Sequence, residues 1–286
     1  MKLYSINCGY FKLDGGAMFG VVPKSIWSKL VPADQNNMCS WALRCLLIED
    51  NDRLILVDTG MGNKQSEKFF AHYYLHGEDS MDKSLAASGF HRNDVTDVFL
   101  THLHFDHCGG AIEYDGDKLV PAFKNATFWS NADHWKWATE PNQREKASFL
   151  KENIIPIEES GRLKFLNNAT KAENKLDAGD VLPGIKIRYA YGHTDAMMLP
   201  QIEYNGKTIV YMADLLPSYA HIPLPYVMGY DTRPLPTMNE KETFLKEALE
   251  KDYILFFEHD ATHECCTLQQ TEKGIRPKEF FKLADI

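Results

Sequence analysis

The apolar residues of this chain fall into short runs, and several of these runs end at a polar or charged residue. Five of them are RLILVD, VTDVFL, IKIRYAYG, TIVYMA and YILFFE. Their length and their β-branched and aromatic residues are typical of buried strands. Apolar runs also flank two turn-forming stretches, Asp50-Asn51-Asp52 within residues 41–58 and Asn205-Gly206 within residues 199–214. Both stretches predict β-hairpins.

Four further stretches predict helices: Lys64–Leu75, Ser130–Thr139, Gln143–Glu152 and Glu240–Lys251. The last has one apolar stripe and a predicted N-cap at Asn239. Strands and helices alternate in both halves of the chain, and no repeat or long linker separates them. The sequence therefore predicts a single domain over residues 1–286, of the α/β or α+β class, with helices covering the sheets.

Composition narrows the class of protein. Hydrophobic residues make up 44% and charged residues 25% of the chain, which predicts a folded protein with a sizeable core. The net charge of -9 counts against nucleic acid or an anionic membrane as a partner. A local basic groove is the alternative that this net charge does not exclude. No stretch approaches the roughly 18 apolar residues of a membrane span, and no signal peptide is recognisable. We therefore expect a cytoplasmic protein with reduced cysteines.

The segment THLHFDHCGG, residues 101–110, places three of the eleven histidines and an aspartate within six residues. Ionised side chains this close repel one another, so a metal ion is the simplest reason for the arrangement. His102 and His104 alternate along an extended segment and share one side of it, where they can bind one ion. Asp106 and His107 follow as the chain turns, which predicts that they bind a second ion.

Three more candidate ligands follow predicted strands: His193, Asp214 and His259. Strand ends can present side chains from a rigid sheet to one shared site. The resulting donors, five imidazoles and two carboxylates, suit zinc best, with manganese, iron and cobalt as alternatives. The sequence thus predicts two divalent metal ions per chain. A further strand ends at Asp58, which is expected to cap a helix or turn.

The segment HLHFDH, followed in order by His193, Asp214 and His259, resembles the signature of the metallo-β-lactamase superfamily. The resemblance covers essentially the whole chain and implies a four-layer αββα sandwich. It also implies that Asp214 bridges two metals and that Asp58 supports the ligands. The implied metal ligands are His102, His104 and His193 for one ion, Asp106, His107 and His259 for the other, and Asp214 for both. The branch that looks most similar contains methyl parathion hydrolase-like and acyl-homoserine-lactone lactonase-like enzymes.

This resemblance implies a hydrolase in which a metal-bridging hydroxide attacks a neutral lactone or carboxylic ester, with an acyl-homoserine lactone as one candidate. An organophosphate triester is the alternative within the same branch. A ribonuclease and an iron redox enzyme are alternatives of other classes, and the acidic composition counts against the ribonuclease. A homodimer is expected from the resemblance.

The catalytic assignments are less direct than the metal ligands. Asp106 and Asp214 are predicted to act in catalysis as well as in metal binding. Lactonases of this branch often carry a tyrosine three residues after the bridging aspartate, whereas Pro217 stands here. Tyr219 and His221 are the candidates to replace that tyrosine, with packing or pocket lining as the alternative role. The remaining histidines with no partner motif are expected at the surface or in helix packing: His72, His76, His134 and His263.

Overall fold

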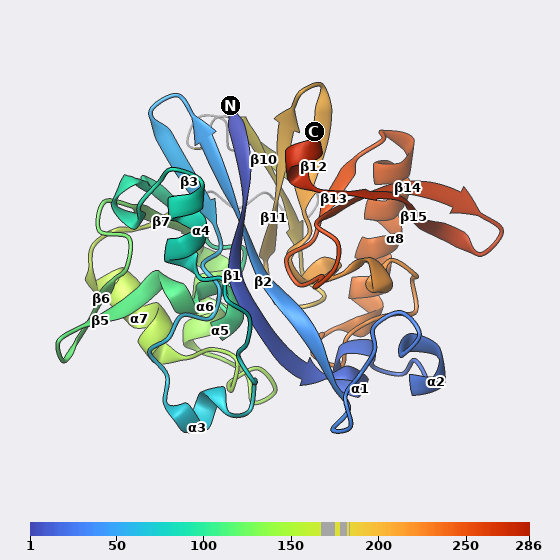
Figure 1. Cartoon of the computed structure of the whole chain (residues 1–286), viewed down its shortest axis with the longest axis horizontal. Coiled ribbons are helices and arrows are strands. Elements are labelled where there is room, and N and C mark those ends of the chain that lie inside the picture. The colour runs from blue at the N-terminus through green and yellow to red at the C-terminus, as the bar shows by residue number, and fades with distance from the viewer. Residues whose placement is uncertain (167–174, 178–181, 183) are drawn as a thin grey trace.

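Two β-sheets face each other in the computed structural model, which describes residues 1–166, 175–177, 182 and 184–286 (Figure 1). The first sheet has the spatial order β1 (Lys2–Asp14), β2 (Met38–Asp50), β3 (Arg53–Val57), β4 (Asp97–Phe99), β7 (Thr127–Asn131), β8 (Leu163–Leu166). The second has the order β15 (Gly274–Phe281), β14 (Cys265–Thr271), β13 (Ile254–Phe256), β12 (Lys207–Tyr211), β11 (Met197–Tyr204), β10 (Ile185–Ala190), β9 (Lys175–Asp177). Strands β5 (Ile112–Asp115) and β6 (Lys118–Pro121) form a separate hairpin.

Helices cover the outer face of each sheet, which gives αββα layers (Figure 1). Those on the side of the first sheet are α4 (Met81–Ala87), α6 (Ala132–Thr139) and α7 (Lys151–Glu159), and α8 (Pro234–Glu250) lies on the side of the second. The short helices are α1 (Gly15–Phe19), α2 (Lys24–Trp27), α3 (Glu67–Phe70) and α5 (Phe105–Cys108), with 3-10 turns at Arg92–Asp94, Gly109–Ala111, Ala213–Leu215, Tyr219–His221 and Leu283–Asp285. The predicted α/β class and four-layer sandwich are confirmed.

The alternation of side chains along β2 explains how one strand serves two cores. Leu46 and Ile48 point into the core between the sheets, where they pack with residues of β10 to β13. Cys45 and Leu47 point to the other face and pack beneath the helices of the first layer. Because successive side chains of a strand leave opposite faces, a strand covered on both faces becomes continuously apolar.

The five apolar runs of the sequence coincide, to within two residues at either end, with strands β3, β4, β10, β12 and β13, and both predicted hairpins are present. Strands β3 and β4 are parallel neighbours in the first sheet, and β12 and β13 are parallel neighbours in the second. Parallel strands end at the same edge of a sheet. The loops that carry the predicted metal ligands therefore leave both sheets at one edge of the sandwich.

Predicted helix boundaries need correction. Only Glu67–Phe70 is helical within the predicted helix 64–75, and the predicted helix 143–152 begins only at Lys151. Residues 130–131 end β7, so the helix there starts at Ala132.

The helix predicted to begin at Glu240 begins instead at Pro234, so Asn239 is an interior residue and not the N-cap. Proline suits a first helical turn because its fixed φ matches the helix and its missing N–H is not needed there. Among the described residues, no helix combines the length and the apolarity that crossing a membrane requires.

Candidate metal centre

The loop that follows β4 is held in place by buried hydrogen bonds. The backbone N–H of Thr101 donates to Asp58 Oδ1 at 2.8 Å, and that of Leu103 donates to His134 Nε2 at 2.9 Å. His134 in turn donates from Nδ1 to the carbonyl oxygen of Asp195 at 2.6 Å. Of the two places expected for His134, the surface or helix packing, the structure shows the second, and this fully buried ring also supports the ligand loop from α6.

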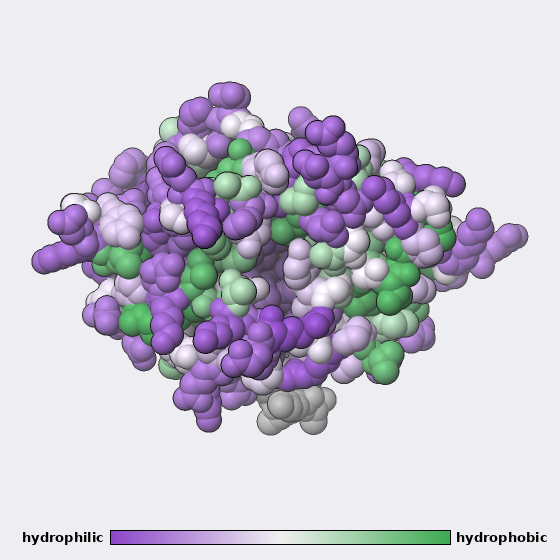
Figure 2. Space-filling view, turned by 90° about the horizontal axis from the view of Figure 1, so that it is seen from below, coloured by the Kyte–Doolittle hydropathy of each residue, from purple (hydrophilic) through white to green (hydrophobic). Residues whose placement is uncertain are grey.

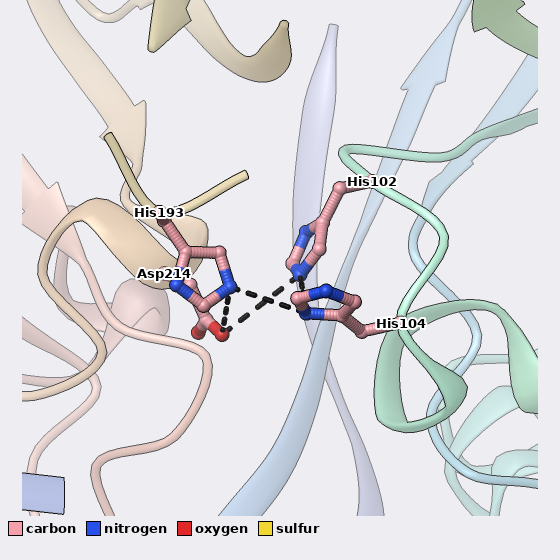
Figure 3. A group of neighbouring side chains, drawn as sticks. All are labelled: His102, His104, His193 and Asp214. Atoms are coloured by element: carbon pink, nitrogen blue, oxygen red, sulfur yellow. Dashed lines mark hydrogen bonds and ion pairs between the residues drawn. The ribbon is translucent and has the colours of Figure 1, made fainter. Parts of the chain in front are cut away.

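One group of candidate ligands consists of His102, His104, His193 and Asp214, each with a ligand atom within 4.8 Å of the others (Figure 3). His104 Nδ1 lies 3.1 Å from His102 Nε2 and 3.2 Å from His193 Nε2. Asp214 Oδ2 lies 3.1 Å from His193 Nε2 and 3.8 Å from His102 Nε2. Three separate loops thus direct nitrogen and oxygen atoms to one point.

A second group consists of Asp106, His107 and His259, again within 4.8 Å of one another. The Nε2 atoms of His107 and His259 are 3.2 Å apart, and Asp106 Oδ2 lies 3.8 and 3.7 Å from them. Asp214 reaches this group as well, since its Oδ1 lies 3.2 Å from His259 Nε2 and its Oδ2 lies 3.5 Å from His107 Nε2. The carboxylate of Asp214 therefore lies between the two groups.

Hydrogen bonds on the far side of the histidine rings determine which nitrogen is free. His193 Nδ1 is bonded to Asp231 Oδ1 at 2.8 Å, and His259 Nδ1 is bonded to the carbonyl oxygen of Ala42 at 2.8 Å. A carboxylate and a carbonyl only accept, so each Nδ1 carries a proton. In the neutral ring, the Nε2 lone pair then points toward the other candidate ligands.

His107 is held by two carboxylates, because its Nδ1 lies 3.1 Å from Asp58 Oδ2 and 3.0 Å from Glu258 Oε2. His104 has the opposite orientation from the other rings. Its Nδ1 faces the first group while its Nε2 lies 3.5 Å from Glu145 Oε1. Asp58, placed behind His107, has the supporting position that the resemblance implied.

These donors fit a divalent metal site. When the rings of His193 and His259 are neutral, their Nε2 lone pairs face His104 Nδ1 and His107 Nε2 at 3.2 Å. Such lone pairs repel one another unless a cation lies among them. The mixture of imidazole nitrogen and carboxylate oxygen is the donor set that zinc and related ions accept.

The protonation of the ligand residues reflects the charge around them. Burial opposes the charged form of His193, but the negative charge of Asp214 and hydrogen bonds to Asp214 and Asp231 outweigh it and raise the pKa of His193 to about 10. Burial likewise opposes protonation of His259, whereas Asp214 and Glu258 raise its pKa to about 9. Without metal, these rings therefore bind protons at neutral pH, and a metal ion has to displace them.

Three supporting residues were missed in the sequence: Glu145, Asp231 and Glu258. Of the three, only Glu258 has a signal in the sequence, because it ends an apolar run and directly precedes the predicted ligand His259. Glu145 and Asp231 lie in loops without a motif. Only the three-dimensional arrangement brings them to His104 and His193.

A cavity of about 360 Å³ opens beside both ligand groups. Its apolar and aromatic lining includes Leu13, Met18, Tyr73, Phe105, Met228 and Tyr230. Its polar lining includes Arg144, Glu145, Ser148 and the ligands His104, Asp106, His193, Asp214 and His259. Figure 2 shows the face of the molecule on the side of α1 to α3, which is largely hydrophilic and hollowed near its centre. A small organic molecule with an apolar part can bind in such a cavity.

Tyr219 and His221 do not line this cavity. The Tyr219 hydroxyl donates to the carbonyl oxygen of Leu30 at 3.1 Å. His221 is stacked on Phe19 and bonded through Nε2 to the carbonyl oxygen of Met18. Burial lowers the pKa of His221 to about 3, so its ring stays neutral. The structure thus brings together the predicted metal ligands and leaves these two proposed proton donors in packing positions.

An αββα sandwich with histidines and aspartates gathered where strands of both sheets end is the architecture of a metallo-β-lactamase-type protein. Comparison with protein families agrees, since the metallo-beta-lactamase superfamily matches residues 44–259. The chain belongs to this superfamily.

Relatives of known function and solved structures resemble nearly the whole chain. An N-acyl homoserine lactonase of Bacillus thuringiensis is 27% identical over 279 residues, covering 92% of this chain and 94% of the relative. The crystal structure of a probable metal-dependent hydrolase from Staphylococcus aureus is 28% identical, with a TM-score of 0.86, over 98% of this chain and 96% of the other. The structure of AidC, a dizinc quorum-quenching lactonase in complex with a product, is 21% identical, with a TM-score of 0.76, over 98% of this chain and 95% of the other. This similarity agrees with the fold of the present chain. Two of these relatives are named as lactonases, one of them dizinc, and the third is named as a probable metal-dependent hydrolase.

Proposed function

We propose that this protein is a dinuclear metal-dependent hydrolase that cleaves a lactone or carboxylic ester, with an N-acyl homoserine lactone as the first candidate substrate. The activity is proposed by analogy with the B. thuringiensis lactonase, which is similar along almost its whole length. The proposed metal ions are two zinc ions per chain. Proposed ligands are His102, His104, His193, Asp106, His107, His259 and the bridging Asp214.

The position of Asp214 carries this proposal. One oxygen of its carboxylate lies 3.1 Å from His193 Nε2 and the other lies 3.2 Å from His259 Nε2. A single carboxylate therefore touches both groups of candidate ligands, which is the arrangement expected when two ions share one bridging ligand. When bound, such a pair of ions supplies a nucleophilic hydroxide near neutral pH and polarises the oxygen of the substrate carbonyl.

The protein's own side chains shape the environment of the reaction. Leu13, Met18, Phe105 and Met228 line the cavity and exclude water from an apolar group of the substrate. Asp106 lines the same cavity, so its carboxylate can accept a proton or a hydrogen bond beside the substrate as well as hold a metal. The phenols of Tyr73 and Tyr230 also line the cavity and are better placed to contact substrate than Tyr219 or His221.

Elemental analysis of the purified protein, combined with assays on the same sample, tests the proposal. We expect about two zinc ions per chain and turnover of N-acyl homoserine lactones or aryl esters. Loss of a residue that only supports a metal ligand costs about 10–100-fold. Because Asp106 is itself a proposed ligand, Asp106→Asn is expected to lower kcat/KM by at least about 100-fold. The control is Asp252→Asn, which alters an exposed aspartate paired with Lys207 and is expected to leave turnover unchanged.

Other outcomes favour other functions. Turnover of a phosphotriester without lactone turnover would favour the organophosphate alternative. RNA cleavage, or one iron per chain with an absorption band in the visible range, would replace the lactonase proposal by a nuclease or a redox enzyme. Unchanged lactone turnover in Asp106→Asn would contradict the assigned role of Asp106.

Three broader predictions accompany this function: the chain acts as one domain over residues 1–286, in the cytoplasm, and as a homodimer. Size-exclusion chromatography with light scattering measures the oligomeric state, and a monomeric mass would exclude the dimer. The net charge of -9 supports a neutral small-molecule substrate over nucleic acid.

A further inference from the structure

Arg144 is the one arginine or lysine among the described residues that line the cavity. It lies between α6 and α7, directly before Glu145, whose Oε1 is 3.5 Å from the His104 ring. The backbone here is held by Asn142, which accepts hydrogen bonds from the N–H groups of Arg144 and Glu145 at 2.9 and 3.1 Å. The arginine therefore starts from a fixed position beside the metal centre.

The guanidinium of Arg144 is also held at its far end. Its Nη2 donates to the carbonyl oxygen of Gly229 and, at 3.4 Å, to that of Asp231. The Asp231 carboxylate supports His193 at 2.8 Å. Arg144 thus spans two segments that each contact a candidate metal ligand. Less side-chain freedom is lost when such a prepositioned group binds a ligand.

The donors of Arg144 complement the rest of the cavity. Glu145, Asp106 and Asp214 contribute only acceptors to the polar lining when ionised, and much of the remaining lining is apolar. A guanidinium has five N–H donors in one plane, and bonds from Nη2 leave those of Nη1 and Nε to contact a bound molecule. The matching substrate has an oxygen acceptor outside the bond that is cleaved.

We infer that Arg144 is a specificity-determining residue, which binds the amide carbonyl of an N-acyl lactone and thereby favours N-acylated lactones over plain alkyl lactones. This inference rests on the proposed lactonase function. The amide lies next to the lactone ring in such substrates. An arginine anchored beside the metal centre can contact its oxygen while the ring carbonyl faces the metal ligands.

The test compares two substrates in the zinc-loaded protein: N-hexanoyl homoserine lactone and an alkyl γ-lactone of similar length without an amide. Arg144→Met keeps a long side chain and removes the donors. We expect its kcat/KM for the N-acyl lactone to fall by about tenfold or more, mainly through KM, because a charge-assisted hydrogen bond is lost. For the alkyl lactone we expect a change within about twofold.

Arg162→Met is the matched control, because Arg162 is exposed and does not line the cavity. Metal content and melting temperature of both variants verify folding. Equal losses for both substrates in Arg144→Met would show that the side chain only holds the two loops together, and this would overturn the inference. If the wild type opens alkyl lactones but not N-acyl lactones, the inference is wrong while the lactonase function stands. If the metal-loaded wild type opens neither, both are wrong.

Discussion

Asp231 provides a quantitative test of how the metal centre is supported. Its side chain is 2% exposed, and Oδ1 accepts a hydrogen bond from His193 Nδ1 at 2.8 Å. A hydrogen bond to a charged group contributes about 1.5–3 kcal/mol, and each 1.4 kcal/mol corresponds to about tenfold in affinity. Asp231→Ala is therefore expected to weaken zinc binding by about 10–100-fold. Asp231→Asn keeps a neutral acceptor, so we expect a loss of only about 3–10-fold.

The loss of zinc affinity in Asp231→Ala is expected to be smaller at pH 7 than at pH 9. In the metal-free protein Asp231 helps raise the pKa of His193 to about 10, so at pH 7 a proton competes with zinc for this ring. Removing the carboxylate lowers that pKa and weakens the competition, which offsets part of the lost affinity at pH 7. The measured loss should therefore grow as the pH rises from 7 to 9.

Competition with a chelator of known zinc affinity measures the zinc affinity of the wild type and of both Asp231 variants at each pH. Asp252→Asn is the control, since Asp252 lies at the surface and pairs with Lys207. Thermal unfolding of the metal-free variants separates lost metal affinity from lost folding. Zinc affinity of Asp231→Ala within about twofold of wild type at pH 9 would refute the view that Asp231 orients His193.

Three further predictions concern backbone packing, pH and buried charge. A Cβ at Gly110 would overlap the carbonyl oxygen of Thr59, so Gly110→Ala should lower the free energy of unfolding by about 1–3 kcal/mol in urea titrations. Zinc affinity of the wild type should rise from pH 6 to 9, because metal displaces protons from His193 and His259, and a constant affinity would contradict this. Buried Asp97 accepts hydrogen bonds from Arg53 and Trp129. Asp97→Ala should therefore lower the free energy of unfolding by about 3–5 kcal/mol in the same titrations, and a loss below about 1 kcal/mol would contradict this.

The strands that position the site could be predicted because their signal is local. The runs that form β3, β4, β10, β12 and β13 are short and rich in β-branched and aromatic residues that the core buries, and the two hairpins have turn residues of their own. Helix ends were less predictable. Glu145 lies in a run that resembles a helix, yet its carboxylate accepts from Asn142 and Trp137 in a turn, and such contacts override helix propensity.

The sequence by itself determined which residues can bind metal, because histidines and aspartates at strand ends repel one another or leave polar atoms buried unless a cation joins them. The alternation and the turn in residues 102–107 predicted two ions, the resemblance assigned His193, His259 and the bridging Asp214, and the structure shows that geometry in its own distances. Only the tertiary structure revealed Asp231 behind His193, His134 beneath Leu103 and Arg144 in the cavity wall. These contacts join segments far apart in the chain. Periodicity and residue spacing describe only neighbouring residues, so they do not predict which loops meet when two sheets pack together.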